Sequence, residues 1–122
     1  MNLLDAGDQH AIVWDVIKAA IPDAYVGRAI PSTYPAKMVI VNRDASIFRD
    51  YRHQGARFRV RCMAKAYLDA DLLSRAVRKA LEGVERHDYI VSARRDLGPM
   101  DVDDPSGLAC IYSGFAVTWR TN

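Results

Sequence analysis

The sequence lacks the features of a secreted or membrane-spanning chain. No run of apolar residues reaches the about 18 needed for a transmembrane helix. The N-terminal residues MNLLDAGDQH contain no basic segment followed by an apolar one, so no secretion signal is expected. These absences predict a soluble domain without a membrane partner.

Cysteine is scarce, with two residues in 122. Cys62 and Cys110 stand in separate strand-like segments, with no CxxC spacing and no histidine nearby. This pattern favours two buried thiols in a reducing compartment over a disulfide.

Recognisable catalytic motifs are also missing. The chain contains no GxSxG, no Walker A loop and no GxGxxG. His10, His53 and His87 lie in three separate polar segments, and none has a second ligand at metal spacing. We interpret them as solvated surface residues, and we predict no enzyme activity and no cofactor.

Acidic residues gather in one stretch, DVDDPSG, where Asp101, Asp103 and Asp104 follow Asp96. An EF-hand loop needs Asp or Asn and then Gly where Pro105 and Ser106 stand. The stretch therefore favours an acidic turn over a metal site.

The composition indicates one globular domain covering 1–122. Half of the residues are hydrophobic and 26% are charged, which allows a buried core and argues against disorder. A net charge of +2 is too small to indicate nucleic-acid binding by bulk charge alone.

Periodicity predicts two helices and five strands. The first helix begins near Asp8 and stops before Pro22, and the second is capped by Asp69 or Asp71 and ends at Gly83. Leu72, Leu73, Ala76, Val77, Ala80, Leu81 and Val84 form the apolar stripe of the second helix. The predicted strands cover 25–30, 38–41, 56–66, 89–94 and 108–120.

Two connections stand out. The polar stretch 42–55 is predicted to be a long loop, and 97–107 is predicted to be a turn or an extended excursion. The order α-β-β-β-α-β-β with short links predicts an α+β fold. We expect a mostly antiparallel mixed sheet packed with two helices, a single-layer sandwich.

One strand carries a row of basic residues. Arg57, Arg59, Arg61 and Lys65 alternate with apolar residues, so they share one face. Their repulsion can be relieved by carboxylates on a neighbouring strand, by water, or by a protein or phosphate partner. Solvation or pairing within the chain is the default. The loop adds basic and aromatic residues suited to a protein or nucleic-acid contact, namely Arg43, Phe48, Arg49, Tyr51, Arg52 and His53.

The second half of the sequence resembles the tail terminator proteins of long-tailed, non-contractile bacteriophages, particularly those that infect actinobacteria. Three features between Arg57 and Arg120 carry the resemblance: RFRVRCMAKAYLDADLLSRAVRKALEG, the Leu97-Gly98-Pro99 segment leading into DVDDPSG, and the closing strand YSGFAVTWR. The first half agrees more loosely. The stretch NRDASIFRDYRHQG is longer and poorer in glycine than the family pattern.

The resemblance implies a structural virion protein, made in the host bacterial cytoplasm and located at the tail–neck junction. Such proteins form a ring, usually of six subunits, that caps the tail tube, stops its polymerisation and offers the docking surface for the head connector. DNA passes through the channel without specific binding. No catalysis and no cofactor are involved.

The expected interfaces follow from this resemblance. The loop residues Phe48, Arg49, Tyr51, Arg52 and His53 are assigned to the tube or the connector. Arg57, Arg59 and Arg61 are assigned to the channel or to an acidic patch of the next subunit, for which Asp101, Asp103 and Asp104 are candidates. The alternatives are another neck protein, such as a head completion or connector-stopper protein, a small nucleic-acid-binding α+β module, and a small enzyme, ranked last.

Overall fold

The computed structural model describes residues 6–49, 53–84 and 88–120. In chain order the elements are α1 (Ala6–Ala20), β1 (Tyr25–Gly27), β2 (Lys37–Arg49), β3 (His53–Ala64), α2 (Tyr67–Glu82), β4 (Ile90–Val102) and β5 (Ala109–Arg120). The strands form one sheet in the order β1-β2-β3-β5-β4, in which only the β1–β2 pair is parallel. The predicted fold class is confirmed.

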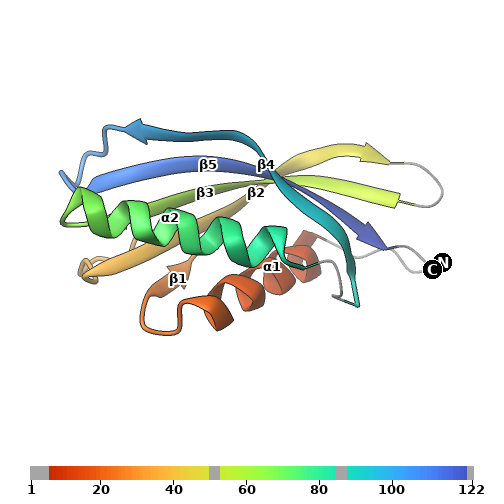
Figure 1. Ribbon diagram of the computed structural model, residues 1–122, viewed down its shortest axis with the longest axis horizontal. Coiled ribbons are helices and arrows are strands. Elements are labelled where there is room, and N and C mark those ends of the chain that lie inside the picture. Colours follow the sequence, from red (N-terminus) through yellow and green to blue (C-terminus); the bar gives the residue numbers. More distant parts are fainter. Residues whose placement is uncertain (1–5, 50–52, 85–87, 121–122) are drawn as a thin grey trace.

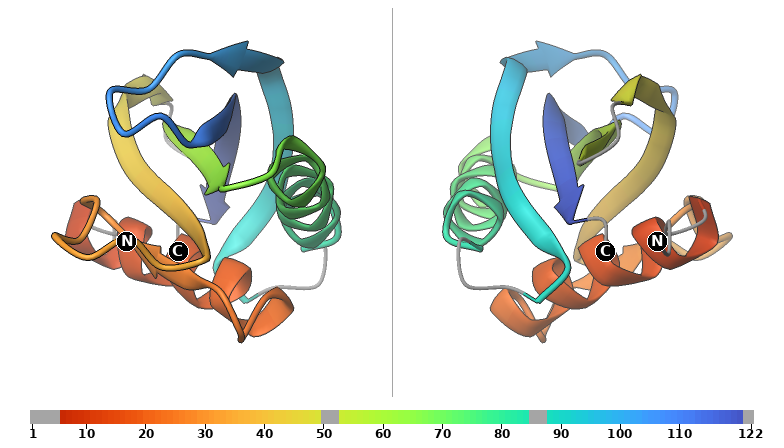
Figure 2. Two further views of the ribbon diagram at one scale, coloured as in Figure 1. Left: turned by 90° about the vertical axis from the view of Figure 1, so that its left-hand side faces the viewer. Right: turned by 90° about the vertical axis from the view of Figure 1, so that its right-hand side faces the viewer.

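Both helices lie against one face of the sheet, as Figures 1 and 2 show. α1 packs beside β1 and β2, while α2 packs beneath β3, β5 and β4. We call the helix-covered side the inner face and the opposite side the outer face. Neither helix, over the residues described, has the length and apolarity to cross a bilayer.

The main core lies between the inner face and the helices. Alternate residues of β3, including Phe58 and Val60, meet Phe115, Val117 and Trp119 from β5, and all are nearly or fully buried. The rings of Phe58 and Trp119 contact edge to face, with centroids 6.2 Å apart. The period-2 pattern of β3 therefore builds the core face that the sequence predicts.

A second, smaller apolar cluster lies on the outer face. Met38, Ile40, Met63 and Cys110 are buried there by Ile30, Val102 and Leu108. The covering residues belong to the β1–β2 connection (Ile30), to the last residue of β4 (Val102) and to the segment between β4 and β5 (Leu108). At one end of the outer face, these segments thus cover apolar residues of the sheet, as the helices do on the inner face.

The prediction that 42–55 forms a long loop is wrong. β2 runs on to Arg49 and β3 starts at His53, and the two strands pair as far as Arg49 opposite Gln54. The register shifts twice, between Arg43 and Ala45 and between Ser46 and Phe48. Figure 1 shows this part of the hairpin beyond the ends of both helices. Without a helix to cover it, the ribbon needs no continuous apolar face, so its sequence shows no alternation.

β4 is also longer than predicted, because it continues through the Gly-Pro segment to Val102. Register shifts at Ile90/Ser92, Arg95/Leu97 and Leu97/Met100 break its alternation. Gly98 adopts φ +80°, and a Cβ there would lie 2.5 Å from the Tyr112 carbonyl oxygen. The turn itself is confined to 103–108. β1 is shorter than predicted, ending at Gly27.

The helix boundaries require two corrections. α1 begins before Asp8, which lies in its first turn instead of capping it. α2 begins at Tyr67 after Ala66, without a side-chain cap, so neither Asp69 nor Asp71 is the N-cap. The predicted end is confirmed, since the Gly83 N–H bonds the Lys79 carbonyl. Leu72, assigned to the buried stripe, is 55% exposed.

Candidate interaction surface

The basic row lies on the outer face, as the alternation of β3 predicts. Arg57 and Arg59 are exposed and Arg61 is half-buried, while Phe58 and Val60 between them point into the core. The row is not a bare positive surface, because each of these arginines has a carboxylate of the same chain within 4 Å.

Arg57 makes the closest of these contacts. Its Nε and Nη2 donate to Asp96 Oδ2 over 3.0 and 2.7 Å. Asp96 belongs to β4, and β5 lies between β4 and β3. A Cβ on Gly114 would lie 3.2 Å from Asp96 Oδ1 and 3.1 Å from Leu97 Cβ. The missing side chain at Gly114 therefore lets Asp96 and Leu97 lie over β5.

The other two arginines contact different elements. Arg59 Nε lies 3.9 Å from Asp44 Oδ1, at the register shift in β2. Arg61 Nη1 lies 3.9 Å from Asp104 Oδ1, in the turn before β5. The three ion pairs thus connect β3 to β4, to β2 and to the acidic turn. Pairing within the chain, the default expectation for this row, is confirmed for these three arginines.

Asp104 also organises the acidic turn. Its carboxylate accepts a hydrogen bond from the Ser106 N–H at 3.0 Å, and its carbonyl accepts the Gly107 N–H at 3.0 Å. Hydrogen bonds from Ser106, together with the charge of Arg61, hold the pKa of the Asp104 carboxyl below its usual value. The predicted acidic turn is confirmed for this part of the stretch.

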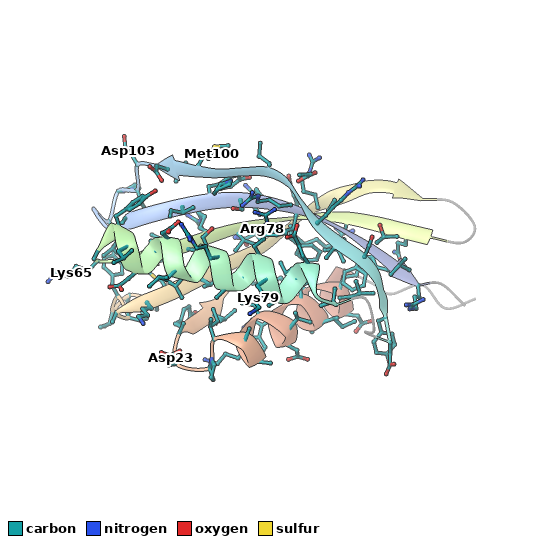
Figure 3. All side chains as sticks on the ribbon, in the orientation of Figure 1. Asp23, Lys65, Arg78, Lys79, Met100 and Asp103 are labelled. Carbon is teal, nitrogen blue, oxygen red and sulfur yellow. The ribbon has the colours of Figure 1, made fainter. Side chains whose placement is uncertain are left out.

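The remaining acidic residues of the stretch point elsewhere. Asp101 lies near Tyr67, and its negative charge raises the pKa of the Tyr67 hydroxyl. Asp103 is exposed at the end of the sheet (Figure 3). Among the residues described, no group of three histidine, cysteine or acidic side chains converges as a metal site would require.

The loop residues assigned to an interface fall partly outside the described residues. The backbones of Phe48 and Arg49 lie in β2 and that of His53 lies in β3, so these three belong to the β2–β3 hairpin. Tyr51 and Arg52 lie outside the described residues. The role of these five loop residues in assembly stays a prediction. His87, which was not assigned to an interface, also lies outside the described residues.

His10 corrects the prediction that the histidines are solvated. It is 7% exposed, and its Nε2 lies 2.8 Å from the Val41 carbonyl oxygen. β1 ends opposite Ile40, so this carbonyl is just past the last residue that β1 pairs with. Gln9 is also buried and accepts a hydrogen bond from Arg43 Nε at 2.8 Å. Polar residues of α1 thus bind the β2 edge where β1 no longer covers it.

The two cysteines are buried free thiols, as the sequence favours. Burial raises the pKa of the Cys62 thiol to about 12, with a further contribution from Cys110. Burial also raises the pKa of Cys110. A thiol of this kind is protonated near neutral pH and makes a poor nucleophile.

Asp96 and Asp44 are ion-pair partners of the arginine row that sequence reasoning missed. Asp96 precedes a glycine-proline segment that reads as a turn, and Asp44 stands in a stretch that reads as a loop. The signal that could locate Asp96 is β5 itself, since Ala116 and Gly114 face Arg57 and Arg59, whereas Asp44 lies on β2, on the other side of β3. Two small residues opposite two long cations leave room for a carboxylate from the next strand.

Comparison with known proteins shows the fold and no sequence family. No protein family and no curated protein matches the sequence. Among solved structures, a chain from the virion of a native gene transfer agent particle is similar, with a TM-score of 0.73. The match covers 98% of this chain and 100% of that chain at 16% sequence identity. The two chains therefore share one fold from end to end.

Proposed function

We propose that this protein is a structural component of a phage-like virion that works as a ring at the tail–neck junction. The observation that carries the proposal is the full-length similarity to a chain of a gene transfer agent virion. The resemblance of the second half of the sequence to tail terminators supports the finer assignment.

As a tail terminator, the protein binds the end of the tail tube, stops its polymerisation and presents the surface to which the head connector docks. The β2–β3 hairpin supports this role, because its distal part lies beyond the ends of both helices (Figure 1), while β3 stays anchored to β5 along its whole length. A hairpin end anchored in this way can contact a neighbouring protein. We assign Phe48, Arg49, Tyr51, Arg52 and His53 to that contact.

The ion pairs on the outer face support a structural role over nucleic-acid binding. Arg57, Arg59 and Arg61 each have a carboxylate nearby, which lowers the net positive potential available to a phosphate backbone. This arrangement fits a ring through which DNA passes without specific contacts. Asp103 remains exposed for a contact with the next subunit.

The direct test is length control of the tail tube. Tube protein of the same phage is polymerised with and without this protein and is viewed by electron microscopy. We expect shorter tubes with a ring at one end, and loss of both effects with Tyr51→Ala combined with Arg52→Ala. Rings found on the portal, with tubes left uncapped, would assign the protein to the head side of the neck. Unchanged tubes without any bound ring would contradict the proposal.

A further inference from the structure

The first two turns of α2 carry an exposed apolar patch. Leu68 and Leu72 are 66% and 55% exposed, and Tyr67 beside them is 56% exposed. Leu68 and Leu72 stand four residues apart, so their side chains are neighbours on one helix face. We call Tyr67, Leu68 and Leu72 the α2 patch. Clustered exposed apolar residues of this size mark an interaction surface better than isolated ones.

Basic residues flank the Leu68–Leu72 stripe along the chain, while Asp101 and Asp103 lie beside Tyr67 and Lys65. Lys65 precedes the helix at the end of the molecule (Figure 3), and Arg75 and Lys79 continue the Leu68–Leu72 stripe at helical spacing. All three side chains are exposed. Arg75 pairs with Asp71 at 2.9 Å, and Lys65 lines a hollow with Asp101 and Asp103, so Lys79 is the basic residue that this helix face offers to a partner.

The other end of the molecule carries a complementary surface. Asp8, Ala11, Ile12 and Tyr89 line an open hollow of about 370 Å³. Tyr89 is 52% exposed, and Ile12 is half-buried against the main core. Asp15 continues the same face of α1, and Asp88 adjoins Tyr89 in the chain. Both are exposed. We call this apolar hollow with its acidic rim the α1 hollow.

We infer that the α2 patch of one copy docks into the α1 hollow of a second copy of this chain. The start of α2 lies at one end of the molecule, and the starts of α1 and β4 lie at the other (Figure 1). One chain therefore cannot bring the two surfaces together, whereas two copies can. Leucines enter an apolar hollow, and Lys79 meets aspartates at its rim.

A contact between two different surfaces of identical chains is heterologous and closes into a ring when its rotation allows. The inference rests on the proposed function only in taking the assembly to be a closed ring. It adds the two surfaces that would join neighbouring subunits. Neither surface includes the outer face or the β2–β3 hairpin, and the hairpin stays available for the tube and the connector.

Site-directed cross-linking tests the contact directly. Leu72→Cys protein is mixed with Ala11→Cys protein and treated with a short bismaleimide. The native thiols are buried, so they contribute little background. We expect a covalent dimer in the mixture and not in either variant alone. The chain carrying both substitutions should give a ladder that stops at the ring. Tyr34→Cys, at a position 51% exposed, replaces Leu72→Cys as the matched control.

Charge reversal gives an independent readout by light scattering over a concentration series. Lys79→Glu alone and Asp15→Lys alone should each raise the concentration for half-assembly roughly tenfold. Equimolar mixing of the two variants should partly restore assembly, and the double variant should restore it fully. Both positions are exposed, so the fold should be unchanged by circular dichroism.

Two results would overturn the inference. One is assembly without the mixed cross-link, which leaves the proposed function standing on other surfaces. The other is a protein that stays monomeric at every concentration and either forms no mixed cross-link or cross-links as well with Tyr34→Cys as with Leu72→Cys. The tube-length assay then decides the proposed function separately, because it needs no assembly in free solution.

Discussion

The two faces of the sheet are built by the same strands but differ in what covers them. On the inner face, alternate residues of β3 and β5 meet both helices in one continuous core. On the outer face, the intervening residues hold three ion pairs and a small apolar cluster at one end. The comparison teaches that stability resides mainly on one side, which leaves the other side free for contacts with partners. Substitutions on the two faces should separate these roles.

The largest effect is expected on the inner face. Phe58→Ala removes a fully buried ring that contacts Trp119, so it should lower the free energy of unfolding by about 3–5 kcal/mol. Urea denaturation measures the loss. Arg59→Ala, the next residue on the outer face, is the matched control and should change stability by about 1 kcal/mol or less. Equal losses at the two positions would erase the distinction between the faces.

A smaller effect is expected where β4 approaches β5. Gly98→Ala places a Cβ against the Tyr112 carbonyl oxygen in addition to straining a positive φ. It should cost about 1–3 kcal/mol. Gly107→Ala shares the positive φ (+79°) but has nothing within 4 Å of its Cβ. The Gly107 variant should therefore be less destabilised in the same denaturation assay. A loss of unfolding free energy as large as that of Gly98→Ala would show that the positive φ, and not the contact with Tyr112, causes the destabilisation.

Acid should reveal the contribution of the turn on the outer face. The pKa of Asp104 is lower in the folded state, so its stabilising contribution is present above the ordinary value of 3.8. That contribution is lost as the pH falls through the folded pKa. Asp104→Asn should be less stable than the parent protein near neutral pH. The gap should close in strong acid, as followed by thermal unfolding against pH. Asp103→Asn, at an exposed position in the same turn, is the control.

The smallest effect is expected for the ion pair between Arg57 and Asp96. Both side chains are partly solvated, with 44% and 24% exposure, so their coupling energy should be about 1 kcal/mol or less. A double-mutant cycle with Arg57→Ala and Asp96→Ala measures it, and added salt should reduce it. A coupling several times larger and insensitive to salt would mean that the outer face also stabilises the fold.

The sequence-based predictions were correct where a helix covers a strand and failed where none does or where the strand register shifts. Alternation from Ala56 onward predicted β3, its buried side and its exposed arginines correctly, because a helix-covered strand must keep an apolar face. The same rule failed for Asn42 to Arg49, where α1 meets Arg43 through the polar side chain of Gln9 and the rest of the strand runs beyond the ends of both helices (Figure 1). It failed again in β4, where register shifts break the period before Asp96 and Met100.

Individual side chains were harder to place. His10 reads as a surface residue, because its partner is a backbone carbonyl that no sequence pattern marks. The partners of the arginine row depend on register shifts in β2 and β4, which sequence periodicity does not reveal. Leu72 was assigned to the core because hydrophobicity alone does not separate a buried leucine from one kept exposed. The exposed position is what makes it a candidate contact.

The central position of β3 also has a consequence for how the chain folds. On one side β3 pairs with β2 through a short connection, so this hairpin closes a small loop at low entropic cost. On its other side β3 pairs with β5, and α2 and β4 lie between them in the sequence. Local pairs form sooner than distant ones when stabilities are similar. We therefore expect the β2–β3 ribbon to form early and to serve as the edge onto which β5 docks, before the helices complete the inner core.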